Sequence, residues 1–233
     1  MVTQSNFLPW RGFFASLFSV DKIVFLENVQ YTKRDWRNRN IIRDNFEDEK
    51  GCWISVPIIG GGSQSQLLGD AKVHGLEEFY LKFINKIKNV YKKADFLSDV
   101  LILQNAFVDN KGDNGLSALN IRLIKEIIYR LEINIEIDSV YQPSNNTDPS
   151  QRILEIVMAH RGETYLTGPS AKNYLNDNLF KENNIKISYI DFSRLPKGER
   201  MMSDLGYEFS IVDTIARMGF ERTRELTCVD ISF

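Results

Sequence analysis

The sequence has few of the residues that disulfide frameworks, metal centres and histidine-dependent active sites require. Its 233 residues include two cysteines and two histidines. Cys52 and Cys228 have no paired spacing, so we expect no disulfide framework, and the low count is typical of a reducing cytosol. His74 and His160 lie far apart, each without a nearby Cys or His, which gives little support to a zinc site or a Ser-His-Asp triad. We therefore predict no metal ligands.

Long apolar runs and a basic excess are also missing. No run approaches the roughly 20 apolar residues of a membrane helix. The N-terminus lacks the basic region and long apolar run of a signal peptide, so we expect a cytoplasmic protein with no membrane span. Lys and Arg number 29 against 31 Asp and Glu, a formal net charge of -2. Because nucleic-acid binders usually carry a basic excess or a basic face, we expect no nucleic-acid partner.

A phosphate-binding loop of the Gly-Lys-Ser/Thr type is absent as well. The glycine-rich segment Gly60-Gly61-Gly62-Ser63 can bring backbone amides to a phosphate, but it lacks that ending and no clear helix follows it directly. A surface loop is the favoured interpretation of this segment.

The hydrophobic pattern predicts helices that alternate with short strands. Ile23–Leu26 is a short apolar run between charged neighbours, as expected of a buried parallel strand. Leu76–Tyr91 carries one apolar stripe at helical spacing. The further expected helices are Gly12–Val20, Leu97–Phe107, Leu116–Leu131, Ser150–His160, Tyr174–Glu182 and Phe209–Met218, with Gly219 as the C-terminal cap of the last. The further expected strands are Trp53–Ile59, Ala71–Val73, Ile133–Val140, Thr164–Thr167 and Ile185–Phe192.

This alternation favours an α/β fold, a parallel sheet flanked by helices. Met1–Thr3 is too short for a full first strand, although the following residues are typical of the loop after one. The polar segment Gln142–Pro149 is the best internal boundary, which predicts two α/β regions, 1–141 and 142–233, packed as one unit.

A basic and aromatic cluster after the strand Ile23–Leu26 is the leading candidate binding site. Guanidinium groups suit bidentate phosphate contacts, and an indole can stack on a base or a sugar. Crevices at the carboxyl ends of strands are where open α/β sheets bind ligands. The alternative is a solvated loop with one buried tryptophan. The cluster consists of Lys33, Arg34, Trp36, Arg37 and Arg39, with Asn40 at its end.

Polar residues next to the first two expected strands are further candidates. Gln4 and Asn6, with Trp10, can fix a base or hydroxyl groups, although the same residues also shape turns. Glu27 and Gln30 follow the second strand. Glu27 is a candidate general base or a candidate cation ligand, or it pairs with an arginine.

Two candidates lie outside this region. His74, ahead of the strong helix, is a candidate acid-base residue, although a structural role is the safer interpretation. Gly168-Pro169-Ser170-Ala171-Lys172 follows a short strand. Its amides, with Ser170 and Lys172, can bind an anion at a helix start, or the segment is a plain turn.

Four segments together resemble one family. QSNFLPWRGFF, VDKIVFLENVQYTKRDWRNRN, TYLTGPSAKNYL and FSIVDTIARMG look like the WbqC-like proteins in sequence and in order, and VQYTKRDWRNRN is the most specific. That family is associated with bacterial O-antigen and other surface-glycan gene clusters. The resemblance implies work on nucleotide-activated sugars but defines no reaction. A weaker likeness to the Rossmann-like nucleotidyl-transferase fold, without that fold's histidines, is an analogy of fold alone.

These observations lead to three hypotheses. The first is a transferase that forms an amide on a nucleotide-linked amino sugar by acyl or aminoacyl transfer, with ATP as the candidate cofactor. Arg34, Arg37 and Arg39 would hold phosphates, and Glu27 or His74 would handle a proton. The second is a non-catalytic nucleotide-sugar sensor or assembly protein. The third, nucleic-acid binding through the basic cluster, is disfavoured by the net charge.

Overall fold

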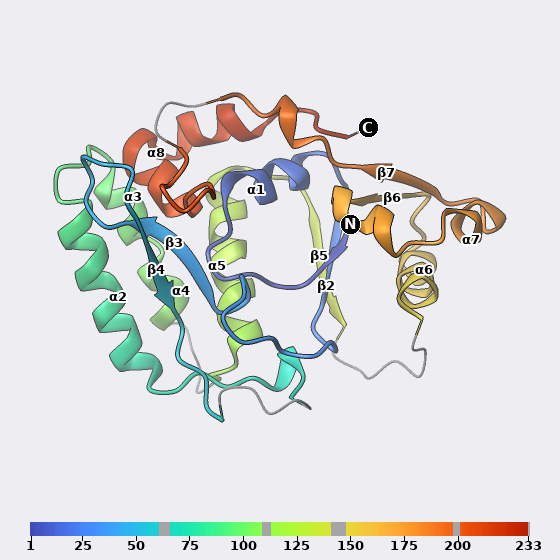
Figure 1. Ribbon diagram of the computed structural model, residues 1–233, viewed down its shortest axis with the longest axis horizontal. Coiled ribbons are helices and arrows are strands. Elements are labelled where there is room, and N and C mark those ends of the chain that lie inside the picture. Colours follow the sequence, from blue (N-terminus) through green and yellow to red (C-terminus); the bar gives the residue numbers. More distant parts are fainter. Residues whose placement is uncertain (61–65, 109–112, 141–147, 198–200, 233) are drawn as a thin grey trace.

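A computed structural model describes residues 1–60, 66–108, 113–140, 148–197 and 201–232 (Figure 1). The predicted glycine-rich loop and the predicted boundary segment Gln142–Pro149 fall mainly outside these residues. The strands are β1 (Val2–Thr3), β2 (Lys22–Leu26), β3 (Arg39–Arg43), β4 (Gly51–Ser55), β5 (Glu136–Val140), β6 (Thr164–Thr167) and β7 (Lys186–Tyr189). The α-helices are α1 (Arg11–Phe18), α2 (Leu76–Val90), α3 (Leu97–Leu101), α4 (Gln104–Val108), α5 (Leu116–Arg130), α6 (Pro149–Ala159), α7 (Asp177–Glu182) and α8 (Ile211–Thr227). Three short 3-10 helices, η1 (Leu68–Asp70), η2 (Pro169–Asn173) and η3 (Phe192–Arg194), complete the described elements.

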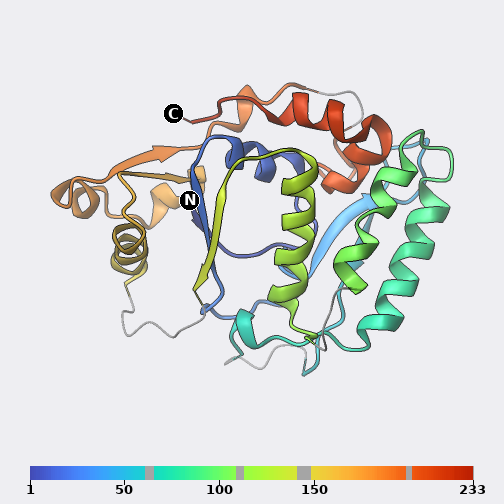
Figure 2. The ribbon, with the colours of Figure 1, turned by 180° about the vertical axis from the view of Figure 1, so that it is seen from behind.

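A small parallel sheet in the order β1-β2-β5 lies at the centre of the molecule, flanked by helices, which confirms the α/β class. Residues 2–3 do form a strand, shorter than a usual one, paired with β2. A second parallel pair, β6-β7, lies on the other side of β1, and β6 contacts β1. Figures 1 and 2 show β6, β7, α6 and α7 at one end of the molecule and α2, α3 and α4 at the other.

The central strand β2 is buried on both faces, as its apolar run predicts. Ile23 and Phe25 belong to the large core that includes α1, α2 and α5. Val24 and Leu26 alternate with them and pack with Ile156 of α6 on the opposite face. Since successive side chains of a strand point to opposite faces, four apolar residues in a row are what a strand covered on both sides needs.

The hairpin β3-β4 differs from expectation. No strand was expected over residues 39–43, but β3 begins at Arg39 and pairs antiparallel with β4. Only two of its five residues are apolar, because Arg39, Asn40 and Arg43 occupy its ends. The hydrophobic pattern therefore does not indicate a strand here. β4 also ends at Ser55 rather than at Ile59, before Pro57, which has no N–H for a strand ladder.

The last helix also departs from the prediction. Ser210 caps it, since its hydroxyl accepts a hydrogen bond from the Val212 N–H at 3.3 Å. We expected the helix to end at Gly219, but α8 continues to Thr227. Gly219 has φ +71°, and a Cβ there would lie 2.7 Å from the Phe96 ring. The helix therefore bends at this glycine, around Phe96, and then resumes.

Helix α8 packs against α1, α3 and β3, although it belongs to the C-terminal part of the chain. Its contact with β3 includes a buried ion pair, in which Arg43 Nε lies 2.7 Å from Asp213 Oδ1. Sequence patterns did not indicate this pair. Among the described helices, none is long and apolar enough to cross a membrane.

Candidate functional site

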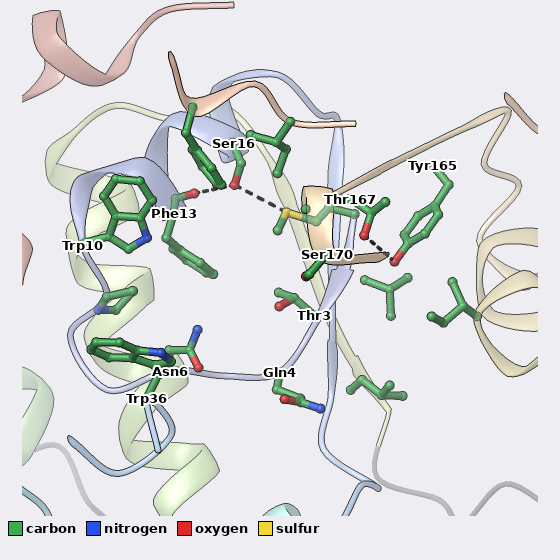
Figure 3. Close-up of a pocket in the computed structure, with 18 of the residues that line it drawn as sticks. Thr3, Gln4, Asn6, Trp10, Phe13, Ser16, Trp36, Tyr165, Thr167 and Ser170 are labelled. Carbon is green, nitrogen blue, oxygen red and sulfur yellow. Dashed lines mark hydrogen bonds between the residues drawn. The ribbon is translucent and has the colours of Figure 1, made fainter. Parts of the chain in front are cut away.

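A cavity of about 340 Å³ opens at the carboxyl ends of β1, β2 and β6 (Figure 3). Thr3 and Gln4 reach it from the end of β1, and Leu26 from the end of β2. Thr167 and Ser170 come from the end of β6 and the 3-10 turn that follows. Its volume is within the range of small-molecule sites, roughly 300–1,000 Å³.

Six of the predicted substrate-binding residues line this cavity, and eight other candidates do not. Those lining it are Gln4, Asn6, Trp10, Trp36, Asn40 and Ser170. The candidates that do not line it are Glu27, Gln30, Lys33, Arg34, Arg37, Arg39, His74 and Lys172. The structure thus brings the amides after β1 and both predicted tryptophans together around one space.

Trp10 forms one wall of the cavity. Its ring packs against Phe192 with centroids 4.9 Å apart. It also covers Gly12 so closely that a Cβ at that position would lie 2.3 Å from the indole. Gly12 is therefore needed for the position of the indole, a role the sequence did not reveal.

Trp36 lies on the other loop of the cavity, near Asn6 (Figure 3). Its carbonyl accepts a hydrogen bond of 2.9 Å from the Phe7 N–H, which joins the loop after β1 to the basic segment. The side-chain amide of Asn40 strengthens this junction by donating to the carbonyls of Phe7 and Leu8 at 3.0 and 2.9 Å. The side-chain oxygen of Asn40 accepts a hydrogen bond from the Ile41 N–H. Both polar groups of this side chain are therefore engaged by the protein, and Asn40 shapes the wall of the cavity.

Gln4 and Asn6 are different, because their side-chain amides have no hydrogen-bond partner among the described residues. Both are half-buried at the cavity. Thr167 and Ser170 add hydroxyl groups opposite them, and the Tyr165 hydroxyl lies 3.3 Å from Thr167 Oγ1 (Figure 3). Free amides and hydroxyls offer both donors and acceptors to a ligand.

The described lining contains no Asp, Glu, His, Lys or Arg side chain. Its titratable side chains are Tyr165 and Tyr174, and burial raises the pKa of each. Both phenols therefore stay neutral at physiological pH. Nor do any three His, Cys, Asp or Glu side chains meet among the described residues as a metal site would need. The described side chains of the lining therefore carry no charge, which suits an uncharged polar group with apolar faces.

Glu27, a predicted proton-handling residue, is fully buried behind the cavity. It accepts hydrogen bonds from the Ser5 N–H at 2.8 Å, from the Ser5 hydroxyl at 3.0 Å and from the Ser117 hydroxyl. Burial raises its pKa, and the bonds from Ser117 and Ser5 oppose that rise. Its carboxylate thus holds Ser5, between Gln4 and Asn6. His74 is exposed ahead of α2.

The predicted cations are arranged in different ways. Lys33 and Arg34 are exposed. Arg37 pairs with Asp35. The Arg39 guanidinium lies over the Trp53 ring, 3.8 Å from its centroid.

Two further candidates also lie apart from the cavity. Lys172 lies over Tyr189, 4.7 Å from the ring centroid. Gln30 is exposed and forms a backbone bridge with Leu67.

Comparison with known proteins identifies a family and a similar protein. The profile of the WbqC-like protein family matches residues 4–225. The chain is also similar to a Mycobacterium tuberculosis (strain ATCC 25618 / H37Rv) protein described as "Uncharacterized protein Rv1507c", with 27% identity over 220 residues, 94% of each chain. No solved structure matches.

Proposed function

The chain belongs to the WbqC-like protein family, and from that premise we propose that it binds a nucleotide-linked amino sugar in the cavity and forms an amide on it. The observation that carries this proposal is the combination of two indoles and two unpartnered amides around one neutral space.

A sugar ring matches this lining. It presents hydroxyl groups at its edge and apolar C–H faces, so it needs hydrogen-bonding groups and flat apolar surfaces together. Trp10 and Trp36 supply the surfaces. Gln4 and Asn6 supply the donors and acceptors, with Ser170 on the opposite side. A phosphate would find no cationic side chain in this lining.

The place of the cavity supports a Rossmann-like organisation, which is part of the proposal. The strands β1, β2 and β5 extend to one side, and β6 and β7 lie on the other side of β1. In doubly wound sheets, ligands bind outside the carboxyl ends of strands where the strand order reverses. The cavity lies between the ends of β1 and β6, and this place is what supports that part of the proposal.

Acyl or aminoacyl transfer is the reaction we propose. The sugar amine attacks the carbonyl carbon of an activated acyl donor, such as a thioester, an ester or an acyl phosphate made with ATP. A C–N bond forms, the bond from carbon to the leaving group breaks, and the proton of the amine passes to the leaving group or to water. The residues of the cavity would act by holding the amine in position.

A second candidate function is binding without catalysis, as a nucleotide-sugar sensor or an assembly protein of a glycan pathway. One observation favours it: no carboxylate, imidazole or amine side chain lines the described cavity, and Glu27 is enclosed by Ser5 and Ser117. Amide formation by an already activated donor needs less acid-base assistance than most transfers, so the lining fits both candidates.

Binding is tested with a thermal-shift panel of nucleotide sugars with and without an amino group. We expect at least one amino-sugar nucleotide to raise the melting temperature. Gln4→Ala and Asn6→Ala should each weaken its binding about tenfold, because each removes hydrogen bonds to the ligand. Asn105→Ala, at an exposed amide outside the cavity, is the matched control and should change nothing. Equal loss in all three variants, or no stabilising ligand at all, contradicts the proposal.

Turnover separates the two candidates. The purified protein is incubated with the bound amino-sugar nucleotide, activated acyl donors and ATP, and the products are analysed by mass spectrometry. A new amide that Asn6→Ala makes more slowly supports the transferase. Binding without product from any donor supports the second candidate.

A further inference from the structure

Three aromatic rings continue from the cavity wall onto the molecular surface. The Trp36 ring lines the cavity and packs on two further rings, Trp53 at a centroid distance of 5.4 Å and Tyr207 at 5.3 Å. Tyr207 and Trp53 lie 6.5 Å apart, so the three rings form one cluster. Tyr207 remains 51% exposed. Neither Trp53 nor Tyr207 is needed by the proposed sugar site.

Backbone hydrogen bonds fix the place of Tyr207. Residues 201–209 form a small hairpin in which the Ser203 N–H donates to the Tyr207 carbonyl at 2.8 Å. Asp204 joins this hairpin to the turn between β3 and β4: its N–H donates to the Glu49 carbonyl, and its carboxylate accepts from the Gly51 N–H at 2.7 Å. Because these hydrogen bonds hold the hairpin in place, the half-exposed ring of Tyr207 provides a preformed surface.

Arg39 adds a cation to this surface. Its guanidinium lies 3.8 Å from the Trp53 ring centroid, which fixes the plane of the group. It has no ion pair or side-chain hydrogen bond among the described residues, and its Nε is buried without a partner. Three other arginines of this half of the chain do have carboxylate partners: Arg11 with Glu208, Arg37 with Asp35 and Arg43 with Asp213.

A positioned guanidinium with free donors is suited to an oxyanion, and phosphate accepts two of its N–H groups at once. A half-exposed ring cluster is suited to a nucleobase, because every base has a flat face for stacking. A nucleotide combines these two groups in one ligand. The neutral cavity would leave the phosphates of such a ligand without a cation, whereas Arg39 supplies one next to the ring cluster.

We infer that Trp36, Trp53, Tyr207 and Arg39 form a separate subsite that takes the nucleotide part of the ligand, with the base on the rings and a phosphate on Arg39. This inference rests on the proposed function, since it assigns the sugar to the cavity and the nucleotide to its neighbour. Trp36 is shared between the two subsites. Trp53 and Tyr207 were not among the residues that the sequence indicated.

Intrinsic fluorescence tests the subsite directly, because all three tryptophans of the chain line the cavity or belong to this cluster. The full-length protein is titrated with a nucleoside diphosphate alone, and separately with the amino sugar free of nucleotide. We expect the diphosphate to quench tryptophan emission and to compete with the nucleotide sugar.

Arg39→Gln should weaken diphosphate binding at least about tenfold, because it removes a charge-assisted contact. Arg34→Gln makes the same charge change at an exposed arginine of the same segment, and it should weaken binding less than about twofold. Tyr207→Ala should weaken binding of the diphosphate but not of the free sugar. Gln4→Ala should do the opposite. Circular dichroism of each variant checks that it is folded.

Equal effects of Arg39→Gln and Arg34→Gln in folded proteins overturn the inference. Binding of the free amino sugar without binding of the diphosphate also overturns it, while the proposed function of the cavity survives. Binding of the diphosphate that is sensitive to Arg39, without any binding of a sugar, supports the subsite and removes the proposed sugar site. If neither ligand binds, both fail.

Discussion

Glu27 holds the loop between β1 and α1 by accepting hydrogen bonds from Ser5 and Ser117. Ser5 lies between the two amides that face the cavity, so the carboxylate fixes Gln4 and Asn6 from behind. Asn120 supports the same loop by donating to the Ser5 carbonyl at 3.4 Å, and it also donates to the Arg37 carbonyl of the basic segment at 2.8 Å. At the scale of single residues, the buried carboxylate of Glu27 therefore has a positioning role next to the binding site. Its position after a strand in the sequence does not distinguish this role from a catalytic one.

The pH dependence of stability is one expected consequence. Burial raises the pKa of Glu27 above its ordinary 4.5, so folding favours the protonated carboxyl. Its contribution to the free energy of unfolding is therefore fully present below pH 4.5 and is lost as the pH rises through the folded-state pKa. Glu27→Gln lacks this dependence. We expect the unfolding free energy of the wild type, relative to the variant, to increase as the pH is lowered from 7 to 5.

Urea unfolding of both proteins at pH 7, 6 and 5 measures this difference. Titrations shared by both proteins cancel in the comparison. A difference that stays constant, or that shrinks as the pH falls, would show that Glu27 is not held in an environment that favours its neutral form.

Gly12 is a second important residue, because the Trp10 ring packs directly against it. A methyl group there would overlap the Trp10 ring. Gly12→Ala should therefore displace the indole and weaken binding of the amino-sugar nucleotide several-fold, although alanine itself favours a helix by about 1 kcal/mol over glycine. In a Trp10→Ala background the same substitution should have almost no effect on affinity. Calorimetric titration of the two single variants and the double variant gives the coupling, and additive losses would rule out the contact as the cause.

At the scale of elements, the Arg43–Asp213 pair joins strand β3 to helix α8 in the interior. Both side chains are almost fully buried, and a second contact joins Arg43 Nη2 to Asp213 Oδ2 at 3.3 Å. The Arg43 guanidinium also lies 4.3 Å from the Phe209 ring centroid. Because a buried charge without its partner is costly, we infer that this pair favours a single register for the docking of α8 on β3.

Removing one partner of this pair should lower the free energy of unfolding much more than removing both. Arg43→Met leaves the Asp213 carboxylate without its arginine partner, and we expect a loss of about 3–5 kcal/mol in the free energy of unfolding. Arg43→Met combined with Asp213→Leu should recover part of that loss. The control is Arg130→Met, which breaks the partly exposed pair with Glu126 and should cost at most about 1 kcal/mol. Urea unfolding at pH 7 measures all of them, and similar losses from Arg43→Met and Arg130→Met would contradict this interpretation.

Elements with a strong apolar period could be predicted from the sequence, and those without one could not. Helices α2 and α5 and strands β2 and β6 lie where periodicity or a buried apolar run placed them. Strand β3 was missed because three of its five residues are polar, and two of these, Asn40 and Arg43, are satisfied by partners distant in the sequence. The continuation of α8 past Gly219 was missed because the glycine accommodates Phe96, a contact that depends on tertiary packing.

The candidate site shows the same limit at the scale of the whole molecule. The residues of the loop after β1, and Trp36 on a neighbouring loop, could be named because unusual polar and aromatic residues follow strands. Thr167 and Phe192 reach the cavity from the other end of the sequence, and Tyr207 reaches Trp36 from a hairpin. Local sequence patterns do not indicate that these distant residues meet in space. The arginines of the basic cluster lie in one segment of the sequence, but their side chains have different partners in space.

The two regions proposed at the sequence level, 1–141 and 142–233, share both the cavity and the packing of α8. The Ser210 hydroxyl, at the start of α8, donates to the Leu8 carbonyl at 2.7 Å, and the Ile211 N–H donates to the Pro9 carbonyl. The loop that carries Asn6 and Trp10 is thus held by residues some 200 positions later in the chain. Treating the regions as one folded unit is consistent with these contacts.

Because the cavity takes its walls from residues 1–40 and from residues 153–192, it cannot exist while the chain is only partly synthesised. A nascent polypeptide with its first hundred residues outside the ribosome has Gln4 and Asn6 but lacks the opposite wall. Ligand capture would then begin only once β6 and the residues after it have emerged, so a bound small molecule would stabilise finished chains and not growing ones.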